Sequence, residues 1–413
     1  MSVSNSAVRL PARSGQLAVF VGMATSQLSG YALNLVATRQ LGPASYGALA
    51  AILTVSLIVS VPSLALQSLA ARSVARRQDQ ARVGDPGPAG LTGNDFLGSL
   101  LGIALVVSLA STAVAAISTA ILTPALNLAL PWQPLFAAAT VAPLALIALG
   151  EGVLQGQGRL RALGWTFLMV GVSRLGFGVA GLAVSGRPSG VLAGIAVGGV
   201  AGATVALGVA RVRRSRRSAG SGWWRQLGSI SAAMGGLLVL ANVDVILARA
   251  TLASGAAGMY AAGALVSRAA YWGPQFVAVS VFARLTHPVH GYRLLLRAAL
   301  AVAGIGACGT VLAAAAGPWL LPKVLGSAYS DIGGVVWIFA LSGFLLALCQ
   351  LFVTGRVARR DDPAATLPWV VALLQVVLIG GWLHGSVVEI ATATLSVNAL
   401  LLCLLAARTS SHP

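Results

Sequence analysis

Two arginines lie within stretches that are otherwise long and apolar enough to cross a membrane. Arg174 is near the middle of the stretch 164–184, and Arg268 lies within 257–283. A charge at this depth is costly and persists only where it faces a protein interior, a wet cavity or an anionic partner. A guanidinium suits phosphate, because its planar donors grip two oxygens and its charge is permanent. The two arginines are therefore candidate ligands of an anionic substrate.

Two acids in neighbouring apolar stretches offer a second explanation of these arginines. At about 1.5 Å per residue, Asp244 lies about 10 Å nearer one face than Arg268, and Glu151 lies about 9 Å nearer the other face than Arg174. Each arginine thus either forms a structural ion pair with its acid or faces a substrate cavity, and the sequence leaves both open. Asp244, and with it Glu151, is also a candidate for gating or for binding a coupling proton or Na⁺.

A faint internal repeat adds two more arginines. Arg39 ends one apolar stretch and is followed by a loop of small residues and by Tyr46, which opens the next stretch. Arg249 and Tyr260 repeat this order in the second half of the chain. The repeat predicts two similar halves in parallel, which is one of the known plans of membrane transporters.

The remaining reactive residue types form no enzyme or metal pattern. The three cysteines, Cys308, Cys349 and Cys403, lie in separate apolar stretches without metal-ligand spacing. The four histidines form no i+4 pair on a helix, His287 and His290 enclose a proline without a nearby acid, and there is no Walker loop for a nucleotide. We expect no catalytic residue, no metal site and no cofactor.

Composition shows which elements must position these residues. Of the 413 residues, 57% are hydrophobic and 9% are charged, against about 25% charged in soluble domains. Stretches long enough to span the hydrocarbon core as helices recur twelve times. They cover 17–38, 47–69, 96–122, 132–154, 164–184, 189–210, 228–248, 257–283, 294–316, 332–354, 366–383 and 387–407. The sequence therefore predicts an all-α polytopic membrane protein with about twelve transmembrane helices.

The placement of positive charge orients these helices. The net charge is +18, and most basic residues fall in alternate loops, which we assign to the cytoplasm. The other loops hold only Arg39, Arg187, Arg249 and Lys323. Both termini are then cytoplasmic, and the charge needs no nucleic-acid partner. The most basic loop, 211–227, is a predicted cytoplasmic linker between an N-terminal six-helix lobe (1–210) and a C-terminal one (228–413).

The sixth predicted helix carries glycine at every fourth position, at Gly190, Gly194, Gly198 and Gly202. Such a row lets two helix backbones approach closely in a membrane. We expect this helix to pack tightly against a neighbour.

One stretch of the first half resembles a known family. Arg39, the turn Leu41–Pro43, the pair Tyr46–Gly47 and the helix end Ala71–Arg72 resemble the first hairpin of bacterial polysaccharide exporters and lipid-linked oligosaccharide flippases. These belong to the multidrug/oligosaccharidyl-lipid/polysaccharide exporter superfamily. In the second half, Asp244, Gly258 and Tyr260, and then Gly326 and Tyr329, are similar to further family positions. Ala283–Arg284 departs from the Pro-Arg that the family often has there.

The resemblance implies a MATE-like fold of two pseudo-symmetric six-helix lobes around a central cavity. It also implies export of a polyprenyl-diphosphate-linked oligosaccharide or polysaccharide precursor, by alternating access, across the bacterial cytoplasmic membrane. In that hypothesis Arg174 and Arg268 hold the diphosphate, Arg39 and Arg249 help at the outer mouth, and Asp244 couples or gates.

The expected partners are the lipid-linked anionic glycan, membrane lipids, and glycosyltransferases or a polymerase of the same pathway. Two alternatives stay open. One is a cation-coupled multidrug exporter of the same fold, and the other is a non-transporting membrane component of a polysaccharide assembly complex.

Overall fold

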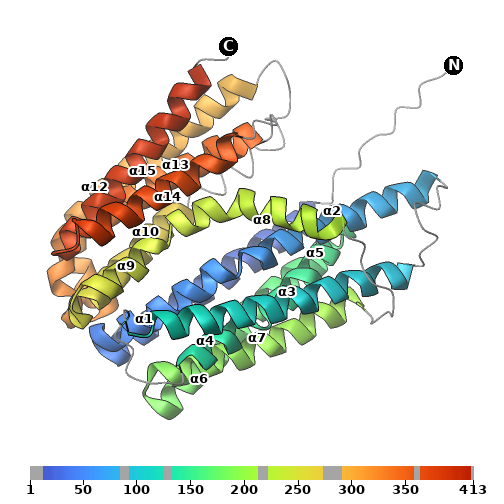
Figure 1. Ribbon diagram of the computed structural model, residues 1–413, viewed down its shortest axis with the longest axis horizontal. Coiled ribbons are helices and arrows are strands. Elements are labelled where there is room, and N and C mark those ends of the chain that lie inside the picture. Colours follow the sequence, from blue (N-terminus) through green and yellow to red (C-terminus); the bar gives the residue numbers. More distant parts are fainter. Residues whose placement is uncertain are drawn as a thin grey trace.

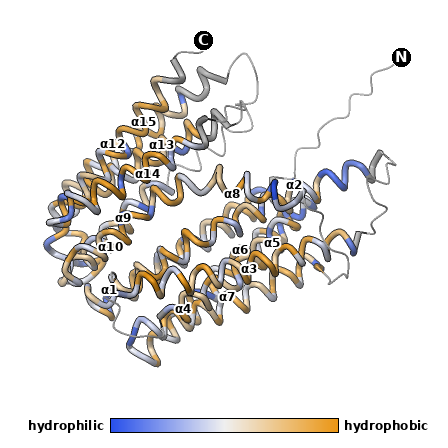
Figure 2. Tube along the Cα trace, viewed as in Figure 1, coloured by the Kyte–Doolittle hydropathy of each residue, from blue (hydrophilic) through white to orange (hydrophobic). Residues whose placement is uncertain are grey.

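Every regular element in the described part of the chain is a helix. The structure, a computed structural model, describes residues 13–83, 93–124, 126, 133–212, 222–272, 291–357 and 363–410. Helices satisfy all backbone hydrogen bonds within one segment, which a lipid environment requires. Figure 2 shows hydrophobic residues along most of each helix and hydrophilic ones gathered near helix ends.

The helices follow one another along the chain in Figure 1. In order, they are α1 (Arg13–Val59), α2 (Val61–Val83), α3 (Gly93–Leu122), α4 (Gln133–Val141), α5 (Leu144–Gly156), α6 (Leu160–Ser185), α7 (Pro188–Ala210), α8 (Gly222–Leu240), α9 (Val243–Thr251), α10 (Ser254–Trp272), α12 (Gly291–Leu325), the 3₁₀ helix η1 (Ser327–Val335), α13 (Val336–Val357), α14 (Pro363–Gly381) and α15 (Val387–Ser410).

These helices confirm the predicted spans. Eight helical stretches of the described residues are long and apolar enough to cross a membrane, and the pair α8–α9, bent by 45°, makes a ninth. One of the eight, Ser14–Gln80, contains the first two predicted spans, and α10 and α14 coincide with two others. Each of the twelve predicted stretches thus coincides with a described helix. The end of the eighth stretch, 273–283, lies outside the described residues.

The turn between the first two spans lies inside α1. Gly42 has φ 70° and ψ 169°, which is not helical, and Pro43 follows it. A residue with a side chain rarely adopts this positive φ, whereas glycine does so readily. Proline then fits the first turn of the new helix, where its missing N–H has no intrahelical acceptor. The Leu41–Pro43 turn expected from the family resemblance is therefore present.

Figure 1 shows two groups of helices that converge at one end and diverge at the other. The first group comprises α1 to α7, and the second comprises α9, α10 and α12 to α15. We call the end at which they converge the junction end; there Arg39 of α1 contacts Val324 of α12, and Arg249 of α9 contacts Leu126. The helix α8 packs against α2 of the first group and α14 of the second. Its first residue is Gly222, so residues 222–227 of the predicted linker 211–227 are helical, and residues 213–221 of it lie outside the described residues.

The row of glycines in α7 packs against α6, as predicted. A Cβ atom built on Gly194 would lie 2.0 Å from the Phe177 carbonyl oxygen, and one on Gly190 would lie 2.2 Å from that of Gly181. Only glycine permits backbones to come this close. The first group is thereby held as one packed unit.

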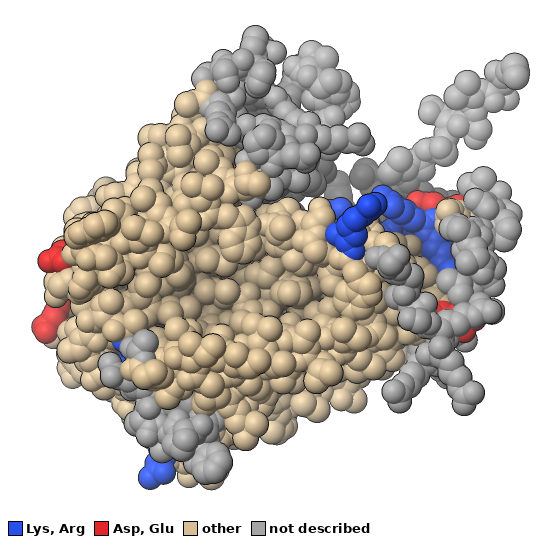
Figure 3. Space-filling model, in the orientation of Figure 1, with Lys and Arg blue, Asp and Glu red and all other residues tan. Residues whose placement is uncertain are grey.

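The outer surface agrees with an apolar environment. In the view of Figure 3, Lys, Arg, Asp and Glu gather toward the ends of the molecule, and other residue types cover the surface between them. Large apolar side chains such as Leu109, Trp165 and Val184 are exposed on it. In water such a surface would be unusual, whereas lipid covers it without cost.

Candidate functional site

Arg268 of α10 reaches from the second helix group to the first. Its side chain is partly buried, and Nη2 donates a 3.0 Å hydrogen bond to Oγ1 of Thr54 on α1. Thr54 is fully buried. The Nε–H of Arg268 is also buried, and no acceptor pairs with it among the described residues. One donor of this guanidinium therefore bridges the two groups, and another has no partner.

Polar side chains of both helix groups surround Arg268. Its positive charge acts on Tyr31 and Tyr46 of α1 and on Asp244 of α9. The ion pair that the sequence left open, between Arg268 and Asp244, is not formed as a direct contact in the described part of the chain. Their charges interact at longer range.

Asp244 is held by a chain of polar side chains inside the second group. Its Oδ2 accepts a 2.7 Å hydrogen bond from the hydroxyl of Tyr260 on α10. That hydroxyl lies 3.4 Å from Oγ1 of Thr394 on α15, which in turn accepts a 3.1 Å bond from Nε2 of Gln375 on α14. Oδ1 of Asp244 and Oε1 of Gln375 are buried and have no donor among the described residues. The chain thus leaves two acceptor oxygens free inside an apolar core.

A break in the seventh span positions Asp244. The helix stops at Leu240 and resumes at Val243 with a bend of 45°. Asn242 lies at this break; its Nδ2 donates to the Leu238 carbonyl, while its Oδ1 is buried without a donor. The acid therefore sits in the first turn of a new helix, where a negative charge is favoured by the helix dipole.

Sequence reasoning missed Gln375, Thr394 and Asn398 as site residues. All three are buried in the second group, and Asn398 donates a 2.8 Å bond to Oγ of Ser342 on α13. The sequence does mark these residues, because all three are polar within apolar stretches and Thr394 and Asn398 lie one helical turn apart. The sequence does not tell which neighbouring helix they face.

Arg174 and Glu151 belong to the first group. Glu151 on α5 is buried at 7% exposure, and Arg174 on α6 is partly buried. The charge of each acts on the other. No hydrogen bond or ion pair joins them in the described part of the chain, so they are neighbours and not a contact pair. Arg174 does not approach Arg268 through any described contact.

Arg39 and Arg249 bind backbone carbonyls at the junction end. Nε of Arg39, on α1, donates a 2.9 Å bond to the carbonyl of Val324, at the end of α12. Nε of Arg249, on α9, donates a 2.9 Å bond to the carbonyl of Leu126, just after α3. Both arginines therefore hold the opposite helix group, which the sequence did not predict.

The chemistry available at these positions is that of binding. No group of three or more His, Cys, Asp or Glu residues able to hold a metal ion occurs within the described ranges. Three arginines, two acids and a set of neutral oxygens lie in the interior instead. Such residues hold anions, protons or monovalent cations.

Among the comparisons with known proteins, the one with solved structures shows the fold. No family model and no curated protein sequence matches the chain. Among solved structures, it is similar to the inward-facing conformation of a multidrug resistance MATE family transporter of the MOP superfamily, with TM-score 0.71, 12% identity and coverage of 96% of this chain and 98% of that chain. The outward-facing conformation of such a transporter gives TM-score 0.61 and 12% identity over 98% and 97% of the two chains.

A third similar structure is the MATE transporter ClbM in complex with Rb⁺, with TM-score 0.58, 16% identity and coverage of 95% of this chain and 92% of that chain. The chain therefore has the fold of the MATE transporters. The identities are too low to carry more than the fold, but the proteins that share it here are transporters and not enzymes.

Proposed function

We propose that this protein is a membrane transporter of the bacterial cytoplasmic membrane that exports a polyprenyl-diphosphate-linked oligosaccharide or polysaccharide precursor by alternating access. The observation that carries the proposal is Arg268, which reaches from one helix group to the other and has a buried Nε–H that meets no acceptor among the described residues. A buried unpaired donor of a charged group is costly. A phosphate oxygen entering between the groups would satisfy it.

Arg174 is the second residue that we assign to the anionic headgroup. Its charge is opposed by Glu151 without a direct contact, so its donors remain available for phosphate oxygens. The sugars would occupy the space between the groups and the lipid tail would stay in the bilayer. Glycosyltransferases or a polymerase of the same pathway would supply or consume such a substrate.

Arg39 and Arg249 are the outermost arginines in this proposal. Both lie at the junction end, which the distribution of positive charge assigns to the outer face. Once that end opens, their donors would face the departing headgroup. The N- and C-termini are then cytoplasmic, and the present structure is closed to the outside. The higher TM-score to the inward-facing transporter supports this orientation.

Asp244 is the proposed coupling or gating acid, with Glu151 as its counterpart in the first group. Around Asp244, the free oxygens of the acid and of Gln375 and the hydroxyls of Tyr260 and Thr394 supply oxygen ligands and a single negative charge. Such a set suits a proton or a small monovalent cation such as Na⁺. The complex of a similar transporter with Rb⁺ supports a cation.

A cation-coupled multidrug exporter of the same fold is the rival proposal, favoured by what the similar structures are called. It requires a site for organic cations. The interior charges disfavour such a site, because Arg174, Arg249 and Arg268 outnumber Glu151 and Asp244 among the buried and partly buried charges named above. A non-transporting component of an assembly complex would need neither site.

The test is a flipping assay with the purified protein in lipid vesicles and a fluorescent lipid-diphosphate-linked sugar. We expect Arg174→Gln and Arg268→Gln each to lower the flipping rate about tenfold or more, since a hydrogen bond to a charged group contributes about 1.5–3 kcal/mol. Arg187→Gln is the matched control, because Arg187 is exposed in the loop before α7. Unchanged flipping by both folded variants, or uptake of organic cations in place of the lipid, would contradict the proposal.

A further inference from the structure

Two arginines cross between the helix groups in opposite directions at the junction end. Arg39 of the first group donates from Nε and Nη2 to the carbonyls of Val324 and Lys323 in the second group. Arg249 of the second group donates from Nε to the carbonyl of Leu126 in the first, and from Nη1 to that of Ala44 at 3.4 Å. Each guanidinium thus holds two carbonyls of the opposite group.

The two contacts are equivalent by position in the internal repeat. Arg39 follows Asn34 by the same number of residues as Arg249 follows Asp244. In each half, a tyrosine that follows the arginine donates a hydrogen bond to that earlier residue. Tyr46 donates to Asn34 at 3.1 Å, and Tyr260 donates to Asp244 at 2.7 Å. The two arginines are therefore the same structural element, present once in each half.

The acceptors lie near the same span of each opposite half. Lys323 and Val324 are among the last residues of α12, which is the third span of the second half, and Leu126 lies four residues beyond the end of α3, the third span of the first half. The last carbonyls of a helix lack intrahelical donors and carry the negative end of its dipole. The guanidinium of Arg39 satisfies such carbonyls at the end of α12. The guanidinium of Arg249 instead holds the turn that follows α3.

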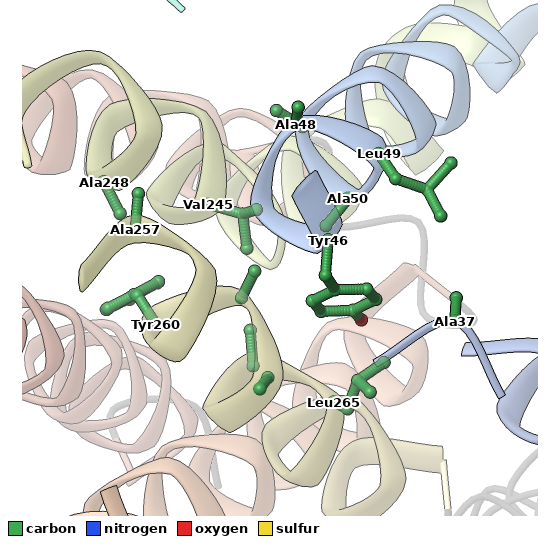
Figure 4. Packing of buried hydrophobic residues seen from close by; sticks show 14 of the residues in the cluster. Ala37, Tyr46, Ala48, Leu49, Ala50, Val245, Ala248, Ala257, Tyr260 and Leu265 are labelled. Carbon is green, nitrogen blue, oxygen red and sulfur yellow. The ribbon is translucent and has the colours of Figure 1, made fainter. Parts of the chain in front are cut away.

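Between the two contacts the groups touch through backbone. A Cβ atom built on Gly258 would lie 1.7 Å from the carbonyl oxygen of Pro43, and one on Gly47 would lie 2.9 Å from Cα of Gly258. Figure 4 shows the packed side chains beside this contact, among them Tyr46, Ala48 and Ala257. The hydroxyl of Tyr329 adds a 3.5 Å bond to the Thr38 carbonyl. At this end, Arg39 and Arg249 supply the charged hydrogen bonds between the two groups among the described residues.

We propose that Arg39 and Arg249 form a reciprocal pair of clasps that hold the junction end closed, and that both must release their carbonyls before the two groups separate there. The clasps act whether or not a substrate is present. Their role is thus independent of the substrate assignment made above. It rests on where the two guanidiniums lie and on what they hold.

The experiment measures the width of the junction end in the full-length protein in lipid nanodiscs, without substrate. Spin labels are placed on Ser185→Cys in the first group and Asp331→Cys in the second, both exposed, after replacement of the three native cysteines. Arg39→Gln and Arg249→Gln should each raise the ratio of separated to closed molecules about tenfold, which is about 1.4 kcal/mol. Because the clasps share no residue, the double variant should show about the product of the two effects.

Three further variants serve as controls. Arg187→Gln removes an arginine near the same end that donates to no carbonyl of the opposite group among the described contacts, and should leave the distances unchanged. Arg39→Lys and Arg249→Lys keep the charge without the fork, so they should fold like the parent and still shift the ratio, by less than glutamine does. A parental distance distribution in the folded lysine variants and the double glutamine variant overturns the proposal.

Discussion

Buried polar atoms without partners mark the interior of this molecule. Oδ1 of Asp244, Oε1 of Gln375 and Nε of Arg268 are all buried and unpaired among the described residues. Folded proteins pair the great majority of such atoms, because each unpaired one costs about 1–3 kcal/mol. Their presence on α9, α14 and α10 is therefore a reason to look for a ligand there.

At the same scale, we predict that Tyr260→Phe destabilises the protein by about 1.5–3 kcal/mol. The substitution removes the 2.7 Å hydrogen bond to Oδ2 of Asp244 and leaves a buried carboxylate without its donor. The free energy of unfolding in detergent, from denaturant titration, measures this loss.

The control for this prediction is the double variant with Asp244→Asn. An amide lacks the charge, so the same loss of the tyrosine hydroxyl should cost about 1 kcal/mol less in that background. Equal costs in both backgrounds would mean that the hydroxyl of Tyr260 acts through Thr394, whose Oγ1 lies 3.4 Å away, and not through the charge of the acid.

At the scale of elements, the contact of α6 with α7 depends on glycine. A Cβ atom on Gly194 would lie 2.0 Å from the Phe177 carbonyl oxygen. We predict that Gly194→Ala destabilises the protein by about 1–3 kcal/mol, as overpacking of a close contact does. Gly208→Ala on the same helix meets nothing within 4 Å and should stabilise by a few tenths up to about 1 kcal/mol. The melting temperatures of both variants, measured in the same detergent, test this prediction. Equal melting temperatures would contradict a role of Gly194 in the packing of α6 against α7.

The turn in α1 gives a second prediction about an element. Gly42→Ala places a side chain at φ 70°, which costs about 1–2 kcal/mol for an L-residue. Gly30→Ala, in the helix before the turn and with nothing within 4 Å of its Cβ, is the matched control and should not destabilise. A melting temperature for Gly42→Ala at or above that of Gly30→Ala would show that the turn does not need a left-handed residue.

The elements were predictable to a larger extent than the site. The spans follow from hydropathy alone, since lipid admits few structures other than helices, and the α7 glycines follow from their spacing. The partners of Arg268 did not follow, because the sequence gives no rotation of one helix against another. An ion pair between Asp244 and Arg268 was left open by the sequence, whereas Asp244 pairs with Tyr260 and Arg268 reaches Thr54.

For the whole molecule, the closed junction end requires Gly258 to lie against Pro43. We predict that Gly258→Ala separates the two groups at that end, because its Cβ would otherwise lie 1.7 Å from a carbonyl oxygen. The spin-label distance between positions 185 and 331 should lengthen in a major fraction of molecules. Gly255→Ala, whose Cβ meets nothing within 4 Å, should leave it unchanged. An unchanged distance in a folded Gly258→Ala protein would mean that the groups meet elsewhere.

The paired tyrosine contacts described above set the two halves apart in one respect. Tyr46 donates to an amide, Asn34, and Tyr260 donates to a carboxylate, Asp244, at the corresponding place. An amide stays uncharged at any physiological pH, whereas a carboxylate can take up a proton. The two halves share the tyrosine and arginine contacts but differ in charge at this position. A change in pH can therefore alter the charge beside Tyr260, whereas the site beside Tyr46 stays neutral.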